Sequence, residues 1–147
     1  MIIRDATAGD LEPWLAMRCA LWPDEDAEDL REHCQRHFGA SGGREVVLIA
    51  CDKDRAIGMI ELSLRDYAEG CDTSPVPFIE GWFVAEDCRR RGVGAALVRA
   101  AEVWAGERGH SEIGSDTQLW NTASQGAHVA LGFEEVERIV CFRKGLG

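Results

Sequence analysis

The chain has 147 residues, enough for one domain whose core needs neither disulfides nor a metal to fold. Asp and Glu outnumber Lys and Arg by 26 to 16, and the resulting net charge of −10 argues against nucleic acid or an anionic membrane as partner. Hydrophobic residues make up 46% of the chain, so the acidity is not that of a disordered tail; it suits solubility and also a cationic substrate.

The N-terminal part is predicted to contain a short strand and two helices. Residues 2–4 form the strand, and Thr7 caps a helix with Asp10 placed as in a capping box. Five residues follow at helical spacing, and all but the arginine are apolar: Leu11, Trp14, Leu15, Arg18 and Leu21. After an acidic stretch, a second helix is predicted around residues 30–38. Three glycines are expected to end it: Gly39, Gly42 and Gly43.

The middle of the chain is predicted to be rich in strands. Residues 45–51 and 56–65 should pair as an antiparallel hairpin, and residues 78–84 form a third strand. An amphipathic helix over residues 93–104 and a short strand at 112–115 follow.

A last helix over residues 122–131 should be capped by Asn121, and terminal strands should follow it. Those strands are expected to hold Phe133, Val136, Ile139, Val140 and Phe142. The order β-α-α-β-β-β-α-β-α-β predicts a single α/β domain over residues 1–147, built on one mixed sheet.

A basic, glycine-containing loop lies between the strand 78–84 and the following helix. Three arginines, residues 89–91, precede Gly92 and Gly94, where the absence of side chains allows a phosphate to approach the backbone. The first turn of the helix adds unpaired N–H groups and the positive end of its dipole. The loop lacks the GxxxxGK[ST] and GxGxxG patterns of nucleoside triphosphate and dinucleotide sites. We therefore predict a pyrophosphate-binding site here.

Residues 89–94 match the [Gln/Arg]-x-x-Gly-x-[Gly/Ala] signature of the Gcn5-related N-acetyltransferases, and the order of elements resembles that family across nearly the whole chain. The resemblance implies a mixed, mostly antiparallel central sheet flanked by helices, with acetyl-CoA as co-substrate and no metal. It implies cofactor contacts from the backbone of the third strand, from the basic loop and from the cap of the last helix. These residues are Trp82, Phe83, Val84, Arg89, Arg90, Arg91, Gly92, Val93, Gly94, Ala95 and Asn121.

Segments outside that signature resemble the aminoglycoside 6'-N-acetyltransferases, over roughly residues 1–144. These segments are residues 21–23, 66–76, 78–81, 115–117 and 132–138. The resemblance implies a cationic aminoglycoside as acceptor, with direct attack of its 6'-amine in a ternary complex. The implied substrate-binding residues are Trp22, Tyr67, Glu80, Asp116 and Glu137. Carboxylates form charge-assisted hydrogen bonds to ammonium groups, and Asp116 or Glu80 is also the candidate catalytic base.

Several alternatives stay open. Many relatives carry a tyrosine as proton donor where this chain has His128, so the sequence assigns no general acid. A covalent acetyl-cysteine on Cys71 or Cys88 is a competing mechanism. The acceptor is alternatively a polyamine or another small amine, or the chain is a non-catalytic acetyl-CoA sensor.

The cellular setting is inferred from the start of the chain and from its cysteines. No secretory signal is visible, and no two of the six cysteines have CxxC spacing. We expect a cytoplasmic protein with reduced, mostly buried thiols, and the family resemblance implies a homodimer.

Overall fold

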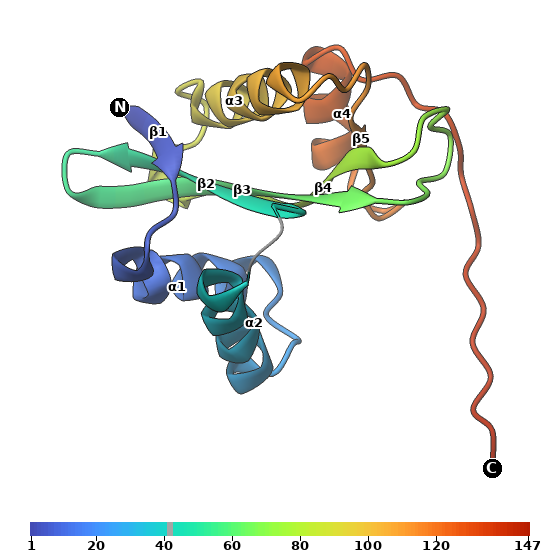
Figure 1. Ribbon diagram of the computed structural model, residues 1–147, viewed down its shortest axis with the longest axis horizontal. Coiled ribbons are helices and arrows are strands. Elements are labelled where there is room, and N and C mark those ends of the chain that lie inside the picture. Colours follow the sequence, from blue (N-terminus) through green and yellow to red (C-terminus); the bar gives the residue numbers. More distant parts are fainter. Residues whose placement is uncertain (41–42) are drawn as a thin grey trace.

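Five strands form one mixed sheet with helices on both faces in this computed structural model, which describes residues 1–40 and 43–147 (Figure 1). The strands lie in chain order across the sheet, antiparallel except for the last pair. They are β1 (Ile2–Asp5), β2 (Glu45–Asp52), β3 (Arg55–Arg65), β4 (Val76–Val84) and β5 (Gly114–Ser115). The predicted mixed, mostly antiparallel sheet is confirmed.

The helices divide into two layers. Helices α1 (Leu11–Leu21) and α2 (Ala27–Gly39) cover one face, and α3 (Val93–Glu107) and α4 (Thr122–Ala130) lie over the other (Figure 1). Two single-turn 3₁₀ helices, Ala8–Asp10 and Glu86–Cys88, precede α1 and α3. The predicted helices are all present, and Gly42, expected to help end α2, lies outside the described residues.

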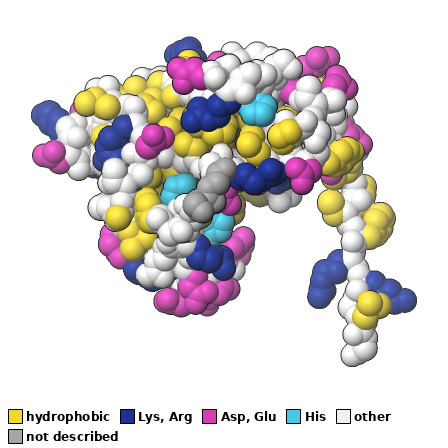
Figure 2. Space-filling view, viewed as in Figure 1, with side chains coloured by type: hydrophobic (Ala, Val, Ile, Leu, Met, Phe, Trp, Pro, Cys, Tyr) yellow, Lys and Arg dark blue, Asp and Glu magenta, His cyan; other side chains and the backbone are white. Residues whose placement is uncertain are grey.

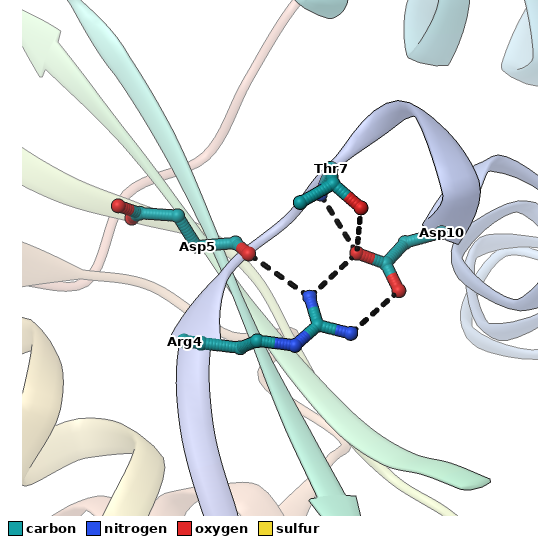
Figure 3. Close-up of polar contacts among 4 residues, drawn as sticks. All are labelled: Arg4, Asp5, Thr7 and Asp10. Carbon is teal, nitrogen blue, oxygen red and sulfur yellow. Dashed lines mark hydrogen bonds and ion pairs between the residues drawn. The ribbon is translucent and has the colours of Figure 1, made fainter. Parts of the chain in front are cut away.

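A hydrogen-bonded carboxylate joins β1 to the start of α1 (Figure 3). Asp10 accepts from the backbone N–H of Thr7 at 2.7 Å and from its hydroxyl at 3.1 Å, and it pairs with both terminal nitrogens of Arg4. Arg4 also donates to the backbone oxygen of Asp5 at 3.0 Å. The Arg4 contact and the Thr7 bonds hold the pKa of Asp10 at about 2, below its usual range. This confirms the predicted capping box.

A β-bulge interrupts the pairing of β3 with β4. Glu61 faces Gly81 and the next residue, Leu62, faces Ile79, which leaves Glu80 as the extra residue on β4. Bulges re-aim side chains and commonly lie next to binding sites. The Glu80 carboxylate therefore leaves the apolar run of β4 toward Ser63 of β3, where it accepts a hydrogen bond.

Strands β4 and β5 separate after a short parallel contact. They pair only through Phe78 with Gly114 and Ile79 with Ser115, and β4 then continues to Val84 while β5 stops. The strand predicted at 112–115 is thus shorter than expected. Beyond Ser115 the backbone of β4 has no neighbouring strand on that side among the described residues, and this leaves its polar groups available to a ligand.

The predicted C-terminal strands are wrong for a single copy of the chain. Residues 133–147 contain no strand, and the end of the segment runs away from the rest of the molecule (Figure 1). Its apolar side chains beyond Phe133 are exposed: Val136, Ile139, Val140 and Phe142. A strand needs a neighbour for its backbone hydrogen bonds, and the described residues of one chain supply none to this segment.

Two further expectations concern the membrane and the thiols. No helix in the described part of the chain is long and apolar enough to cross a membrane. All six cysteines are free, and three of them are buried: Cys34, Cys51 and Cys88. The prediction of reduced thiols agrees with this, whereas burial holds for half of them.

Candidate functional site

The N-terminus of α3 is open to an anion. Gly92 precedes the helix with φ +81°, and the first helical hydrogen bond runs from Ala96 N–H to the Gly92 carbonyl at 3.0 Å. The N–H groups of residues 93–95 therefore lack helical acceptors, and the first turn holds no acidic side chain. Residues 89–95, called the cradle below, thus offer unpaired N–H groups at the predicted pyrophosphate-binding site.

The three arginines beside this helix end have different surroundings. The Arg89 Nε donates to the Val84 carbonyl at 3.0 Å, and its guanidinium lies 5.7 Å from the centre of the Phe83 ring. Arg89 is thereby tied to the end of β4. Arg90 and Arg91 are exposed, and no described residue accepts a hydrogen bond from their side chains. Their charges remain available to a phosphate.

An unpaired indole N–H lies next to the cradle. The Trp82 Nε1 is buried, and no described residue accepts its hydrogen bond. Its ring packs against Gly94, where an added Cβ would stand 3.2 Å from the indole Cζ2. Leaving a buried N–H unpaired costs about 1–3 kcal/mol, so a ligand acceptor at this point would be stabilising. Trp82 thus fits the predicted acetyl-CoA site through its side chain as well as its backbone.

Asn121 caps α4, as predicted. Its side-chain oxygen accepts from the Ser124 N–H at 3.1 Å. The capping role uses the amide oxygen and leaves the amide nitrogen free to donate. A contact from Asn121 to the cofactor therefore stays compatible with the cap.

His128 of α4 lies at the opening between β4 and β5, where it is bonded through both ring nitrogens. The Nδ1 lies 2.7 Å from the Ser124 carbonyl, which only accepts, so Nδ1 carries the proton and Nε2 accepts from the Ser115 hydroxyl at 2.7 Å. The ring meets Trp82 edge-on, with centroids 5.4 Å apart. The histidine that the sequence showed alone is one half of a Ser–His pair.

A cavity of about 270 Å³ lies on the opposite face of the sheet, between β2–β4 and the helices α1 and α2. It brings together two of the predicted acceptor residues, Trp22 and Glu80, with charged residues that the sequence analysis did not select. These are Arg18, Glu25, Glu45 and Glu61. Four carboxylates against one arginine make this lining strongly acidic.

The Trp22 ring rests on the backbone of Gly81. An added Cβ on Gly81 would stand 3.0 Å from the Trp22 ring and 2.6 Å from the Glu61 carboxylate. Only glycine fits between them, so Gly81 is required for the shape of the cavity.

The carboxylate of Glu80 is already paired. Arg65 donates to it through Nε and Nη2, both at 2.7 Å, and the Ser63 hydroxyl donates a third bond. Burial raises the pKa of Glu80, but the bonds from Arg65 and Ser63 outweigh it and leave that pKa below its usual value. Glu80 is therefore an ion-paired carboxylate in this structure.

The remaining predicted acceptor residues lie apart from the cavity. Asp116 follows β5 directly and is exposed; it comes one residue after Ser115, and Glu80 comes one residue after the strand partner of Ser115, Ile79. Tyr67 is exposed in the loop after β3. Glu137 belongs to the C-terminal segment, where its neighbour Val136 touches Gly70 of the same loop.

A buried ion pair forms the wall of the cavity. The Arg18 Nε lies 2.9 Å from the Glu61 Oε1, and the Trp14 indole N–H donates to the same oxygen at 2.9 Å. The guanidinium also lies 5.0 Å from the centre of the Trp22 ring. Burial raises the pKa of Glu61, opposed by Arg18 and Trp14. The arginine in the apolar stripe of α1 was the signal in the sequence for this pair.

Comparison with known proteins identifies close relatives. The sequence model of the acetyltransferase (GNAT) family matches residues 10–133. An aminoglycoside N(6')-acetyltransferase type 1 of Klebsiella aerogenes is 47% identical, covering 99% of this chain and 97% of its own. One from Acinetobacter baumannii is 41% identical over the full length of both. The structure of AAC(6')-Iy in complex with a bisubstrate analog, CoA-S-monomethyl-acetylneamine, superimposes with a TM-score of 0.91 at 38% identity, covering 99% of this chain and 98% of that one.

Proposed function

This chain belongs to the acetyltransferase (GNAT) family, and from that membership we propose that it transfers the acetyl group of acetyl-CoA to the 6'-amine of aminoglycosides. Full-length relatives at 41% and 47% identity carry that activity in their names. The observation that supports the acceptor most directly is the acidic cavity, because aminoglycosides are polycations and carboxylates bind ammonium groups through charge-assisted hydrogen bonds.

Acetyl-CoA brings the acetyl group as a thioester, and this chain supplies the surroundings that hold it. The backbone of residues 82–84 is available along the unpaired side of β4. The α3 N-terminus and the side chains of Arg90 and Arg91 offer positive charge to the phosphates. The unpaired Trp82 N–H adds a donor between the two.

The acceptor amine is mainly ammonium at neutral pH and must lose a proton before it can attack. Asp116 is the better placed of the two candidate bases, because no described residue donates a hydrogen bond to it. Glu80 is held ionised by Arg65, and a lowered pKa makes a carboxylate a weaker base. We assign Glu80 mainly to binding and Asp116 to proton removal, directly or through water.

Direct attack in a ternary complex is favoured over a covalent acetyl-cysteine. Burial and the nearby Glu112 raise the pKa of Cys71 to about 11, which keeps its thiol protonated and unreactive. Cys88 is buried, and its sulfur lies among Arg55 and Asp87 without a histidine that could act as base. Positioning of the two substrates then supplies much of the rate.

The proposal includes a single domain over residues 1–147 that forms a homodimer in the cytoplasm. The exposed apolar side chains of the C-terminal segment support the dimer, since they are expected to be covered by a second copy of the chain. Glu137 lies within the same segment, so its assignment to the acceptor depends on how that segment packs in the dimer.

Thiol release from acetyl-CoA tests the activity. We expect turnover with kanamycin and tobramycin, and none with an analogue in which the 6'-amine is replaced by hydroxyl. Turnover that persists equally with the hydroxyl analogue would refute the regiochemistry. Faster turnover with spermidine than with any aminoglycoside would favour a polyamine acetyltransferase. Acetyl-CoA binding without turnover of any amine would favour the alternative that the chain is a non-catalytic acetyl-CoA sensor.

A further inference from the structure

Arg65 donates to Glu80, the carboxylate assigned above to an ammonium group of the acceptor. Its guanidinium forms a two-pronged pair with Glu80, at 2.7 Å on each prong, beside the acidic cavity. It also stacks on the Phe78 ring at 3.7 Å from the ring centre. Both partners of the pair are only about one third exposed, which limits screening by water.

The three hydrogen bonds to Glu80 leave little room for a further donor. A carboxylate has about four lone-pair positions, and Arg65 and Ser63 take three of them. The charge is also neutralised, so an incoming ammonium meets an ion pair rather than a free carboxylate. Full use of Glu80 by an acceptor therefore requires that the guanidinium move away.

A tethered cation is hard to displace with a single charge. Arg65 is covalently held next to Glu80, so its effective local concentration is in the millimolar range or above. A small amine has to compete with it alone. An acceptor with several ammonium groups can also contact Asp116, because Asp116 and Glu80 each come one residue after the strand pair Ser115 and Ile79, and it can gain a second contact while it replaces the first.

Resting on the function proposed above, we propose that Arg65 is a specificity-determining residue. Its guanidinium occupies the ammonium position on Glu80 in the free protein and thereby selects acceptors that carry several cationic groups. The acceptor's ammonium takes over the hydrogen bonds to Glu80, and the guanidinium turns outward into solvent.

Equilibrium binding measured by calorimetry tests this assignment on the full chain. Arg65→Met keeps an apolar stem for the Phe78 ring and removes the cation. We expect the Kd for butylamine, which carries a single ammonium group, to fall about 10-fold or more, as one freed charge-assisted contact would give. The Kd for kanamycin should fall less, so the discrimination between the two ligands narrows. Arg65→Lys, which keeps a cation, should restore most of the discrimination.

The matched control is Arg31→Met. Arg31 forms a similar two-pronged pair with Glu12, at 2.6 and 3.2 Å, on the exposed surface of α1 and α2 away from the cavity lining. The Arg31→Met substitution removes the same charge and should leave the Kd values for both ligands unchanged. Weaker binding of both ligands to Arg65→Met would refute the proposal and make Arg65 a residue that orients Glu80. An equal gain in affinity in the Arg65 and Arg31 variants would also refute the proposal, because net charge alone would then explain the gain.

Failure of this proposal is distinguishable from failure of the proposed function. Lack of aminoglycoside turnover by the unaltered chain would refute the function, while the butylamine titrations would still report on Arg65. If the unaltered chain acetylates aminoglycosides and the ratio of the two Kd values is unchanged in Arg65→Met, only the role of Arg65 is refuted. Thermal unfolding of each variant shows whether the fold is retained.

Discussion

The two faces of the sheet bury different kinds of side chain. The core beneath α3 is apolar throughout, from Leu48 and Ile60 on the sheet to Leu97 on the helix. The face beneath α1 and α2 holds the three charged side chains that are buried in the described part of the chain: Asp10, Arg18 and Glu61. The same face carries the acidic cavity.

This difference follows the charge of the ligand proposed for each side. The cofactor side meets an anion with backbone N–H groups and exposed arginines, which require no buried charge. The acceptor side meets a polycation with carboxylates, and carboxylates close to a protein core are costly unless cations pair with them. Arg18 and Arg65 are those cations. The acceptor side should therefore respond most strongly to the loss of a single charge.

The largest effect is expected from Arg18→Met. The substitution leaves Glu61 buried without its cation, and breaking a buried pair in this way costs about 3–5 kcal/mol of folding free energy. The loss should be greatest near neutral pH. It should shrink as the pH falls toward the raised pKa of Glu61, because protonation removes the unpaired charge. Urea unfolding at several pH values from about 5 to about 8 measures this loss of unfolding free energy.

The double variant Arg18→Met with Glu61→Leu serves as its control. Replacing both partners by apolar side chains removes the unpaired charge, although the Trp14 N–H then lacks its acceptor. We expect it to recover more than half of the loss. A double variant as unstable as Arg18→Met would show that packing, and not the charge, is what Arg18 contributes.

The fold could be predicted largely because its signals are local. Helices α1 to α4 follow from apolar spacing and from caps such as Asn121, and their positions agree to within a few residues; Thr7 caps the 3₁₀ turn before α1. The C-terminal strands were wrong because an alternating pattern shows that a segment can pair and does not show with what. The apolar side chains of that segment, such as Phe142, find no cover in one chain.

The candidate site divides in the same way. The cradle at Gly92 could be predicted because its parts are consecutive in the sequence. The pairing of Arg65 with Glu80 could not, because it joins residues 15 positions apart across a bulge that no local pattern marks. Glu80 was predicted to bind an ammonium group of the acceptor, and the structure adds that its carboxylate is paired with Arg65. Whether a charged side chain is free or paired depends on its neighbours in the tertiary structure, and a local sequence pattern does not show them.

An intermediate effect is expected from Gly92→Val on the cofactor side. A side chain at φ +81° is strained by about 1–3 kcal/mol, although no atom lies within 4 Å of the added Cβ. Valine should let the loop relax out of this conformation in the free protein, and CoA binding then has to restore it, so the Kd for CoA should rise about 5- to 150-fold. Gly106→Val, on the exposed side of α3 without a positive φ, should leave the Kd unchanged.

The converse variant is Asp116→Asn, which should weaken kanamycin binding about 10-fold and spare CoA. Equal loss of CoA affinity in Gly92→Val and Asp116→Asn would contradict the division of the two sides.

The smallest effect is expected from Asp10→Asn, which probes the charge that joins β1 to α1. Its pKa of about 2 lies below the usual value of 3.8, so the folded state binds this proton less readily than the unfolded chain. The resulting stabilisation is present above about pH 4 and is lost as the pH falls toward about 2. At about 1.4 kcal/mol per pKa unit, and with Arg4 partly exposed, it amounts to about 1–2 kcal/mol.

Asp87→Asn is the control, because Asp87 has a similarly lowered pKa but belongs to an exposed ion pair. The pKa of Asp87 is also held at about 2, by the two bonds from Arg55, but both partners of that pair are more than half exposed. Water and salt screen such a pair, so its removal should alter the unfolding free energy far less. The two substitutions could lower the unfolding free energy equally at about pH 6, and both effects could shrink by the same fraction at about pH 3. That result would show that burial is not the reason why the charge of Asp10 stabilises the fold. If only Asp10→Asn shows the loss, burial of Asp10 in its pair with Arg4 is what makes this charge stabilise the fold.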